Sequence, residues 1–314
     1  MKTILLVTES LEPGNFHRGI RDGFIEQKGY DIVPLCCPRD VSFPYNIYDE
    51  LIMHSISKFR VDILFVIQGE QIQISTIKKI KQAGVNTIVW QVDDPYILTH
   101  APNAKLHKLK LKEYHHVYTT NHGSIEKCYK PAGINAKFLP FGYDPAYHHH
   151  LNLKAEKKYK VSFVGSSFPG RLNYIAPLTK EFREELDLFG CRNKYWNYPY
   201  RVSHKKMIEI ANQSIINLNF SDQPANGVRC LKNRIMEITG SGQFLLSEDF
   251  PEAKMLFTDK ELVLFSSYEE LKEKIRYYLS RDKERDKIAR AGYKRTKENY
   301  SYKKLLSGVL EDAK

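Results

Sequence analysis

The sequence has few cysteines and no long hydrophobic run, and these two absences exclude several classes of protein. Five cysteines occur in 314 residues, without a Cys-x-x-Cys pair. The odd count and the missing pair argue against a disulfide framework and a structural zinc site, and favour reduced thiols in a cytoplasmic protein. The longest apolar runs have the length of a strand, so we expect no transmembrane segment. The amino-terminal run MKTILLVTES is too short for a signal peptide and predicts a buried first strand.

Acidic residues are outnumbered by basic ones. The chain carries 48 Lys and Arg against 37 Asp and Glu, which gives a formal net charge of +11. A solvated basic surface would account for the excess, and so would attraction to an anionic nucleotide-sugar or peripheral contact with a membrane face. The basic residues are scattered rather than clustered in one arm, so we expect no nucleic-acid partner.

Strand-sized runs rich in Ile and Val alternate with helical segments in the first half of the chain. Runs that are apolar throughout are typical of parallel strands covered on both faces. The pattern predicts a Rossmann-like, doubly wound α/β domain. No Gly-x-Gly-x-x-Gly fingerprint follows the first strand, which argues against a dinucleotide cofactor. The expected strands are 2–8, 31–36, 62–68, 86–92, 115–120 and 136–141, and the expected helices are 18–28, 48–59, 75–83 and 123–130.

A second domain of the same kind is expected after a polar, Gly- and Pro-containing stretch at 141–160. We place the domains at 1–150 and 151–295, with 296–314 as a closing helix. Three histidines at 148–150 fit a solvated linker better than a metal site. Ser267 and Glu270 form a capping box ahead of a helix at 268–279. The other strands expected here are 159–165, 214–221, 243–249 and 261–267, and the other helices are 204–211, 283–298 and 302–310.

The stretch from Asn219 to Glu252 is expected to contain the central binding site. Turn formers fill the loop Asp222–Gly227, and we expect a helix from near Val228 to Ser241-Gly242. Free N–H groups at a helix start, with cations beside them, suit a phosphate or pyrophosphate. The cations expected in the first two turns are Arg229, Lys232 and Arg234. Glu237 lies three residues after Arg234, so the two can pair on one helix face.

Three more segments have the position of a ligand-binding loop, directly after an expected strand. Gly165, Ser166 and Ser167 form a small loop whose N–H groups could approach a phosphate, with Arg171 beside it; an ordinary βα turn is the alternative. Asp93 and Asp94 could orient a hydroxyl, act as a base or bind a cation, or could simply form a turn. His17, after the first strand, is either a substrate contact or an ordinary polar residue near a helix start.

Two signatures carry a resemblance to a known family. The first is Arg-x-x-Glu-Ile at 234–238 followed by Gly-x-Phe-Leu-Leu at 242–246, and the second is the tail FSSYEELKEKIRYYLSRDKERDKIARAGYKR. Both resemble the CgeB-like spore-maturation family of group-1 GT-B glycosyltransferases, specifically over the C-terminal half of the chain. The resemblance implies two Rossmann-like domains facing a cleft, with the C-terminal helix crossing back to the first domain.

The resemblance also implies a function. We expect metal-independent transfer of a hexosyl group from a nucleotide-sugar, UDP-linked or similar, to a protein, spore or cell-surface acceptor, with no cofactor. Glu237 matches the glutamate that holds the ribose hydroxyls. The residues assigned to the donor diphosphate are Gly165, Ser166, Ser167, Arg171, Arg229, Lys232, Arg234 and Gly242, and those assigned to catalysis are Asp93, Asp94 and His17.

One position departs from the family pattern. Group-1 retaining enzymes carry Glu-x7-Glu, and here the first of these positions is Arg229. The departure leaves the stereochemical outcome open. It also leaves room for two alternatives: a nucleotide-sugar epimerase or phosphorylase on the same fold, and a protein that binds a nucleotide-sugar without turnover. An epimerase would need paired acids, for which Asp93, Asp94 and Glu248 are the candidates.

Overall fold

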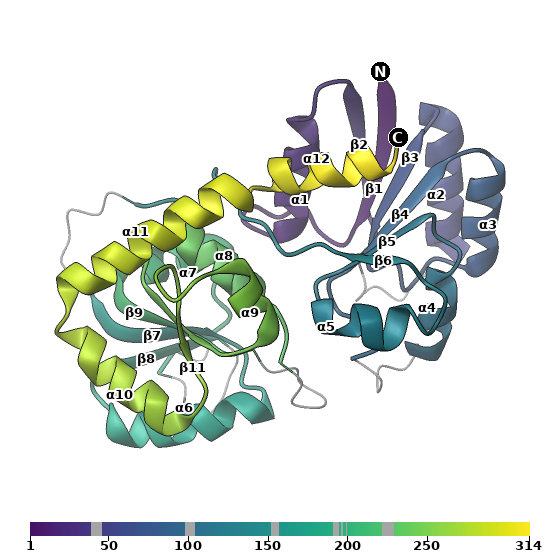
Figure 1. Ribbon diagram of the computed structural model, residues 1–314. Coiled ribbons are helices and arrows are strands. Elements are labelled where there is room, and N and C mark those ends of the chain that lie inside the picture. Colours follow the sequence, from purple (N-terminus) through teal and green to yellow (C-terminus); the bar gives the residue numbers. More distant parts are fainter. Residues whose placement is uncertain are drawn as a thin grey trace. The chain divides into compact units, whose positions relative to one another are not determined.

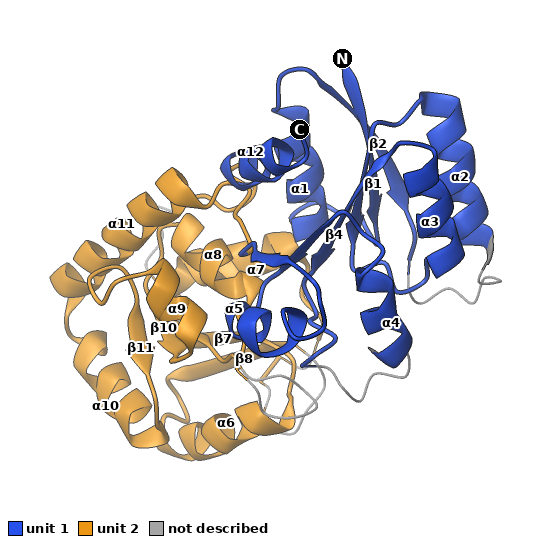
Figure 2. Ribbon diagram, turned by 45° about the vertical axis from the view of Figure 1, so that its right-hand side comes forward, with its two compact units in different colours: residues 1–140, 302–314 blue, residues 141–301 orange. Residues whose placement is uncertain are grey.

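The computed structural model describes the chain in two units (Figure 1, Figure 2). Unit 1 comprises residues 1–140 and 302–314, and unit 2 comprises residues 141–301. The units therefore divide at Pro140, earlier than the expected boundary at 150, and the last helix belongs to unit 1. The residues described are 1–38, 46–97, 104–151, 157–190, 195, 197–198, 200–221 and 229–314.

Unit 1 is built on a six-stranded parallel sheet of order β2-β1-β3-β4-β5-β6. The direction of winding reverses between β1 and β3, which is where ligands bind in open α/β sheets. The strands are β1 (Lys2–Thr8), β2 (Tyr30–Cys36), β3 (Ile63–Ile67), β4 (Asn86–Gln91), β5 (His116–Thr119) and β6 (Ala136–Phe138). The helices are α1 (Phe16–Ile25), α2 (Asn46–Phe59), α3 (Ile74–Gln82), α4 (Ala104–Leu111), α5 (His122–Ser124), the π-helix η1 (Ile125–Tyr129) and α12 (Tyr302–Asp312).

Helices cover both faces of this sheet, with α1 and α12 on one side and α2 and α3 on the other (Figure 1). Alternate residues of β1 point to opposite faces. Leu5 and Val7 pack in the cluster that includes residues of α2 and α3. On the other face Phe24 of α1 meets Phe65 of β3, with ring centroids 5.1 Å apart. Burial on both faces explains why these strands are apolar throughout.

Helix α12 returns to unit 1 and packs directly on α1. Gly23 permits this close approach, because a Cβ there would lie 2.7 Å from the Cβ of Tyr302. Asp312, at the far end of α12, accepts a hydrogen bond from the Tyr118 hydroxyl at 2.5 Å and pairs with Lys137. The carboxyl-terminal helix is thus held at both ends by residues of the first sheet and its helices.

We expect Gly23→Ala to destabilise unit 1. The added methyl would also lie 2.9 Å from the backbone carbonyl carbon of Tyr302, so α12 has to shift, and overpacking of this kind costs ~1–3 kcal/mol. The matched control is Gly308→Ala in α12, where an added Cβ meets nothing within 4 Å and should stabilise by up to ~1 kcal/mol. Urea unfolding measures both variants. Equal stabilisation of the two would contradict the packing argument.

Unit 2 is built on a five-stranded parallel sheet of order β11-β10-β9-β7-β8, with its reversal between β7 and β9. The strands are β7 (Tyr159–Gly165), β8 (Leu186–Gly190), β9 (Ser214–Asn219), β10 (Leu245–Glu248) and β11 (Val263–Phe265). The helices are α6 (Pro169–Glu181), α7 (His204–Gln213), α8 (Asn233–Gly240), α9 (Pro251–Leu256), α10 (Tyr268–Leu279) and α11 (Asp282–Asn299).

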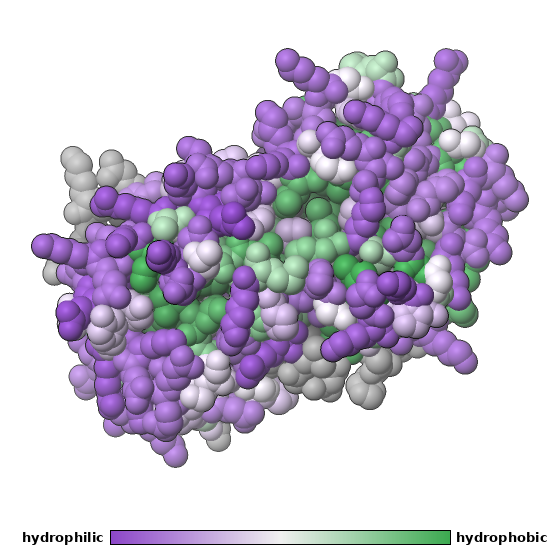
Figure 3. Space-filling view, viewed as in Figure 1, coloured by the Kyte–Doolittle hydropathy of each residue, from purple (hydrophilic) through white to green (hydrophobic). Residues whose placement is uncertain are grey.

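The long helix α11 is largely polar and is buried along one stripe only. Its buried residues are Arg285, Ile288, Gly292 and Thr296, which form one stripe at helical spacing. The outer side of the helix is mostly hydrophilic (Figure 3). Under that stripe the Thr296 hydroxyl meets the Thr239 hydroxyl of α8 at 2.7 Å, which fixes α11 against α8. In the part of the chain that the structure describes, no helix combines the length and the apolar character needed to cross a membrane.

The central helix begins later than expected. Helix α8 starts at Asn233, and its N-cap Lys232 is extended, with φ −109° and ψ 140°. The amide of Cys230 donates to the carbonyl of Ser221 at 2.9 Å, so this segment runs beside the end of β9 instead of coiling. The prediction of a helix from near Val228 was therefore wrong, and Arg229 precedes the helix. The loop Asp222–Gly227 lies outside the described residues.

Candidate functional site

The carboxyl edge of the second sheet gathers the polar residues expected to bind an anion. Because β9 lies between β7 and β10, the segments that follow these strands are neighbours. Gly165 ends β7, and a Cβ on it would lie 2.5 Å from the ring of Phe163. Only glycine fits at this position without a shift of that ring, so local packing favours glycine at the start of the loop 165–167.

Arg171 braces this loop from the first turn of α6. It is buried, its Nη1 donates to the carbonyl of Ser166 at 3.0 Å, and its guanidinium lies 4.7 Å from the ring centre of Phe168. The structure thus brings Arg171 and Ser166 together, as the sequence suggested. A positive charge held beside a loop of small residues raises the local potential for an anion.

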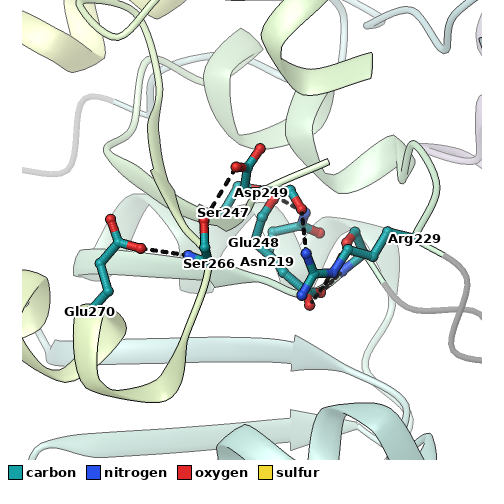
Figure 4. Close-up of polar contacts among 8 residues, drawn as sticks. Asn219, Arg229, Ser247, Glu248, Asp249, Ser266 and Glu270 are labelled. Carbon is teal, nitrogen blue, oxygen red and sulfur yellow. Dashed lines mark hydrogen bonds and ion pairs between the residues drawn. The ribbon is translucent and has the colours of Figure 1, made fainter. Parts of the chain in front are cut away.

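Arg229 and Glu248 form an ion pair at the end of β10 (Figure 4). The Nε of Arg229 lies 2.9 Å from Oε1 of Glu248, and its Nη1 donates to the carbonyl of Asp249 at 3.2 Å. The amide and hydroxyl of Ser221 donate to Oε2 of Glu248 at 2.8 and 2.9 Å. The exposed fraction is 4% for the Glu248 side chain and 40% for that of Arg229. The carboxylate is therefore enclosed, while the cation reaches solvent.

A second layer of hydrogen bonds supports this pair from the neighbouring strand ends (Figure 4). Asn219 Nδ2 donates to the Ser247 hydroxyl at 2.9 Å. Asp249 Oδ2 accepts from the Ser266 hydroxyl at 3.2 Å, and Glu270 Oε2 accepts from the Ser266 amide at 2.7 Å. Strands β9, β10 and β11 are thereby tied together at the edge where Arg229 is exposed.

Glu237 is buried in α8 and already has two hydrogen-bond donors. Asn233 Nδ2 donates to its Oε1 at 2.8 Å, and Arg234 Nη1 donates to its Oε2 at 2.7 Å. The pair with Arg234 that the three-residue spacing predicts is thus present. Each carboxylate oxygen has two lone pairs, so each can still accept one further hydroxyl.

His148 is buried beside this pair, and the expectation of a solvated linker at 148–150 was wrong for it. His148 is 1% exposed, whereas His149 and His150 are exposed. Its Nδ1 accepts the amide of Asp144 at 3.0 Å, so in the neutral ring the proton is on Nε2. Burial lowers the pKa of His148 to about 4, although the Glu237 carboxylate acts in the opposite direction.

We expect His148 to make stability depend on pH in the acidic range. Its pKa is lower in the folded chain than the ordinary 6.5, so the unfolded chain binds more protons between about pH 6.5 and 4. Stability from this group is therefore full above pH 6.5 and falls as pH falls, by up to ~3 kcal/mol. Urea unfolding at pH 7 and pH 4.5 should show a smaller difference for His148→Gln than for the natural chain. An identical difference in both would contradict it.

Two of the expected site residues are placed differently from the rest. Lys232 forms the N-cap of α8 without a side-chain capping bond and makes no ion pair with the described residues. Gly242 adopts φ +70° in the turn that precedes β10, at the amino edge of the sheet, whereas Glu248 ends the same strand at the carboxyl edge. The structure therefore explains Gly242 as a turn glycine and does not bring it to the other residues.

In unit 1, the carboxylate of Asp94 is a structural hub. It is 2% exposed, its Oδ1 accepts the amide of Tyr96 at 2.9 Å, and its Oδ2 accepts the hydroxyls of Thr119, at 3.1 Å, and Ser124. Burial raises the pKa of Asp94 while these hydrogen bonds oppose the rise. The carboxylate joins the ends of β4 and β5 to α5, which fits the turn alternative better than a base.

Asp93 is half-buried, and a residue that the sequence did not single out holds its backbone. Gln68, at the end of β3, accepts the amides of Val92 and Asp93 at 2.8 and 3.1 Å and donates to the Asp93 carbonyl at 3.2 Å. Gln68 is buried with φ +67°, a conformation that non-glycine residues rarely adopt. The sequence feature that could have identified Gln68 is the Gln-Gly pair directly after a buried strand.

His17 lies in the first turn of α1, at the carboxyl end of β1. It is 5% exposed, its Nδ1 lies 2.7 Å from the hydroxyl of Thr8, and its ring stacks on Phe16 with centroids 3.9 Å apart. These contacts fix the ring at the edge where the sheet reverses. Across the ranges that the structure describes, no group of three His, Cys, Asp or Glu side chains could hold a metal ion.

Solved structures with a similar fold include nucleotide-sugar enzymes. Sucrose-phosphate synthase from Thermosynechococcus elongatus aligns with a TM-score of 0.74 and 9% identity over 100% of this chain and 99% of that chain. HepE from Anabaena, in complex with UDP-glucose, aligns at 0.71 and 11% over 100% and 99%. A putative UDP-N-acetylglucosamine 2-epimerase from Listeria monocytogenes aligns at 0.62 and 11% over 99% and 95%. These likenesses show that the fold is GT-B.

The family itself is shown by a sequence model. No curated protein matches the chain. A family model described as glycosyl transferase-like matches residues 152–311, just over half of the chain. This range includes β7 to β11, and hence the ion pair of Arg229 with Glu248 and the carboxylate of Glu237. The chain therefore belongs to the glycosyl transferase-like family, and its enzyme class is that of the GT-B glycosyltransferases.

Proposed function

We propose that the chain transfers a hexosyl group from a UDP-linked sugar to a hydroxyl of a protein, spore or cell-surface acceptor in the cytoplasm, as a CgeB-like member of its family. The observation that carries the proposal is the exposed guanidinium of Arg229, held at the carboxyl edge beside β7, β9 and β10. HepE, which has a similar fold, binds UDP-glucose. The CgeB-like signature around Arg234 and Glu237 supports the finer family assignment.

Without a metal, the protein has to neutralise the leaving diphosphate with its own groups. Arg229 and Lys232 precede α8, where the free N–H groups of the helix start add positive potential. The backbone of the loop 165–167 and the charge of Arg171 act from the other side of β9. The bond between the anomeric carbon and the diphosphate oxygen breaks as the acceptor oxygen forms its own bond to that carbon.

The acceptor hydroxyl loses a proton in this step, and Asp93 is the candidate to receive it. Its backbone is fixed by Gln68 at the carboxyl edge of the sheet, and the carboxylate of Asp94 accepts three hydrogen bonds that join β4, β5 and α5. His17, held by Thr8 at the carboxyl end of β1, is the other candidate contact with the acceptor. Both assignments place acceptor chemistry in unit 1 and nucleotide binding in unit 2.

Epimerisation of a nucleotide-sugar is the second candidate, because the fold is also similar to that of the Listeria epimerase. That reaction needs acids that can exchange protons at the sugar. Glu248 is enclosed by Ser221 and paired with Arg229, so it is poorly suited to this role. Release of UDP from the donor separates the two candidates, since an epimerase keeps the nucleotide-sugar bond at the end of turnover.

We expect UDP to stabilise the protein in a thermal-shift panel of UDP, GDP, dTDP and CDP. Glu237→Gln should weaken UDP binding by about tenfold, because a carboxylate bond to ribose contributes ~1.5 kcal/mol. The matched control is Glu185→Gln, which removes a partly exposed ion pair with Lys160 at the amino end of β8. Unchanged affinity in Glu237→Gln would remove the ribose assignment. No stabilisation by any nucleotide would overturn the proposed function.

A further inference from the structure

Glu248 is a buried carboxylate whose partners all come from other elements. Ser221 follows β9 and supplies two hydrogen bonds, while Arg229 precedes α8 and supplies the ion pair. Tyr174 of α6 also contacts the pair, and its pKa is raised by burial and by the negative charge of Glu248. A buried ion pair is weak evidence for stability, since desolvation offsets most of its attraction. The arrangement therefore needs another explanation.

Arg229, the exposed residue of the ion pair, explains the arrangement. A guanidinium has five N–H donors in a fixed plane. Glu248 takes the Nε edge of Arg229 and the carbonyl of Asp249 takes one N–H of Nη1, which together fix the plane of the group (Figure 4). The other N–H groups of the guanidinium are not used by these two partners. The Arg229 side chain is 40% exposed at the carboxyl edge of the sheet.

We propose that Glu248 is a positioning residue that fixes the guanidinium of Arg229 for an oxygen of the donor diphosphate. This role of Glu248 rests on the proposed function, and it adds how the guanidinium that binds the diphosphate is oriented. It also predicts the sign of a charge effect. A negative charge that merely lay near the diphosphate would weaken binding, whereas one that orients Arg229 strengthens it.

The test is a double-mutant cycle on UDP affinity, measured by calorimetry at fixed ionic strength with the full chain. We expect Arg229→Met and Glu248→Gln each to weaken UDP binding about tenfold, the amount that one charge-assisted hydrogen bond provides. The double variant should be no weaker than Arg229→Met alone. Glu185→Gln, whose ion pair with Lys160 lies outside this network, should bind like the natural chain.

Tighter binding by Glu248→Gln, unchanged binding, or an equal loss in the Arg229→Met background would each overturn the inference. If Glu248→Gln does not fold, Arg229→Lys replaces it, because lysine keeps the charge but lacks the planar fork. We then expect an affinity close to that of Arg229→Met, and natural affinity would overturn the inference. UDP binding that depends on Glu237 but not on Arg229 would sink this inference alone, whereas absence of nucleotide binding by the natural chain would sink the proposed function.

Discussion

A single buried carboxylate organises the carboxyl edge of the second sheet. Glu248 ends β10 in a nearly solvent-free position, where Ser221 and Arg229 surround its carboxylate with donors that offset the cost of burying it. Removing any one of these partners would leave charge or hydrogen-bonding capacity unsatisfied. The end of β9, the end of β10 and the segment before α8 are therefore linked in position.

This constraint gives physical meaning to the one departure from the group-1 pattern. Where those enzymes carry the first glutamate of Glu-x7-Glu, this chain has Arg229, and the charge at that position is reversed. The negative charge has not disappeared from the edge, because Glu248 supplies one from the end of β10. Glu248 is directed at Ser221 and Arg229, so the two residues together offer a directed cation instead of an exposed anion.

The parts of the fold set by local chemistry could be predicted from the sequence. Strand β3 is apolar throughout because both faces are covered, and α10 begins after Ser267, whose hydroxyl accepts the amide of Glu270 at 3.2 Å. The start of α8 could not be predicted, since no side chain caps it and a backbone bond between Cys230 and Ser221 holds the preceding segment extended. Helix α4 (AKLHKLKL) was missed because it buries the polar residues His107 and Lys110 while Leu106 and Leu109 are exposed, so its apolar residues mark no buried face.

The candidate site also has parts that the sequence predicted and parts that it did not. Spacing along α8 predicted the pair of Arg234 and Glu237, and the position after a strand predicted the loop 165–167. Arg229 and Glu248 are far apart in sequence. Neither the hydrophobic periodicity nor a sequence motif predicts their contact. The burial of His148 was hidden for a related reason, because polar neighbours made its segment resemble a solvated linker.

The two sheets wind with the same order at their reversal, yet their carboxyl edges are stabilised by different chemistry. In unit 1 the edge is held by amides and hydroxyls, with Gln68 bonded to the backbone of Asp93, Gln91 bonded to the carbonyl of Gln68 at 2.9 Å, and Thr119 and Ser124 donating to the Asp94 carboxylate. In unit 2 it is held by charges, with Arg229 paired to Glu248. Carboxylates at this edge suit the proposed proton transfer to Asp93, whereas a cation at the edge of unit 2 suits the proposed diphosphate. The proposed division of the reaction between acceptor and donor would then follow from which groups each sheet uses to close the same edge.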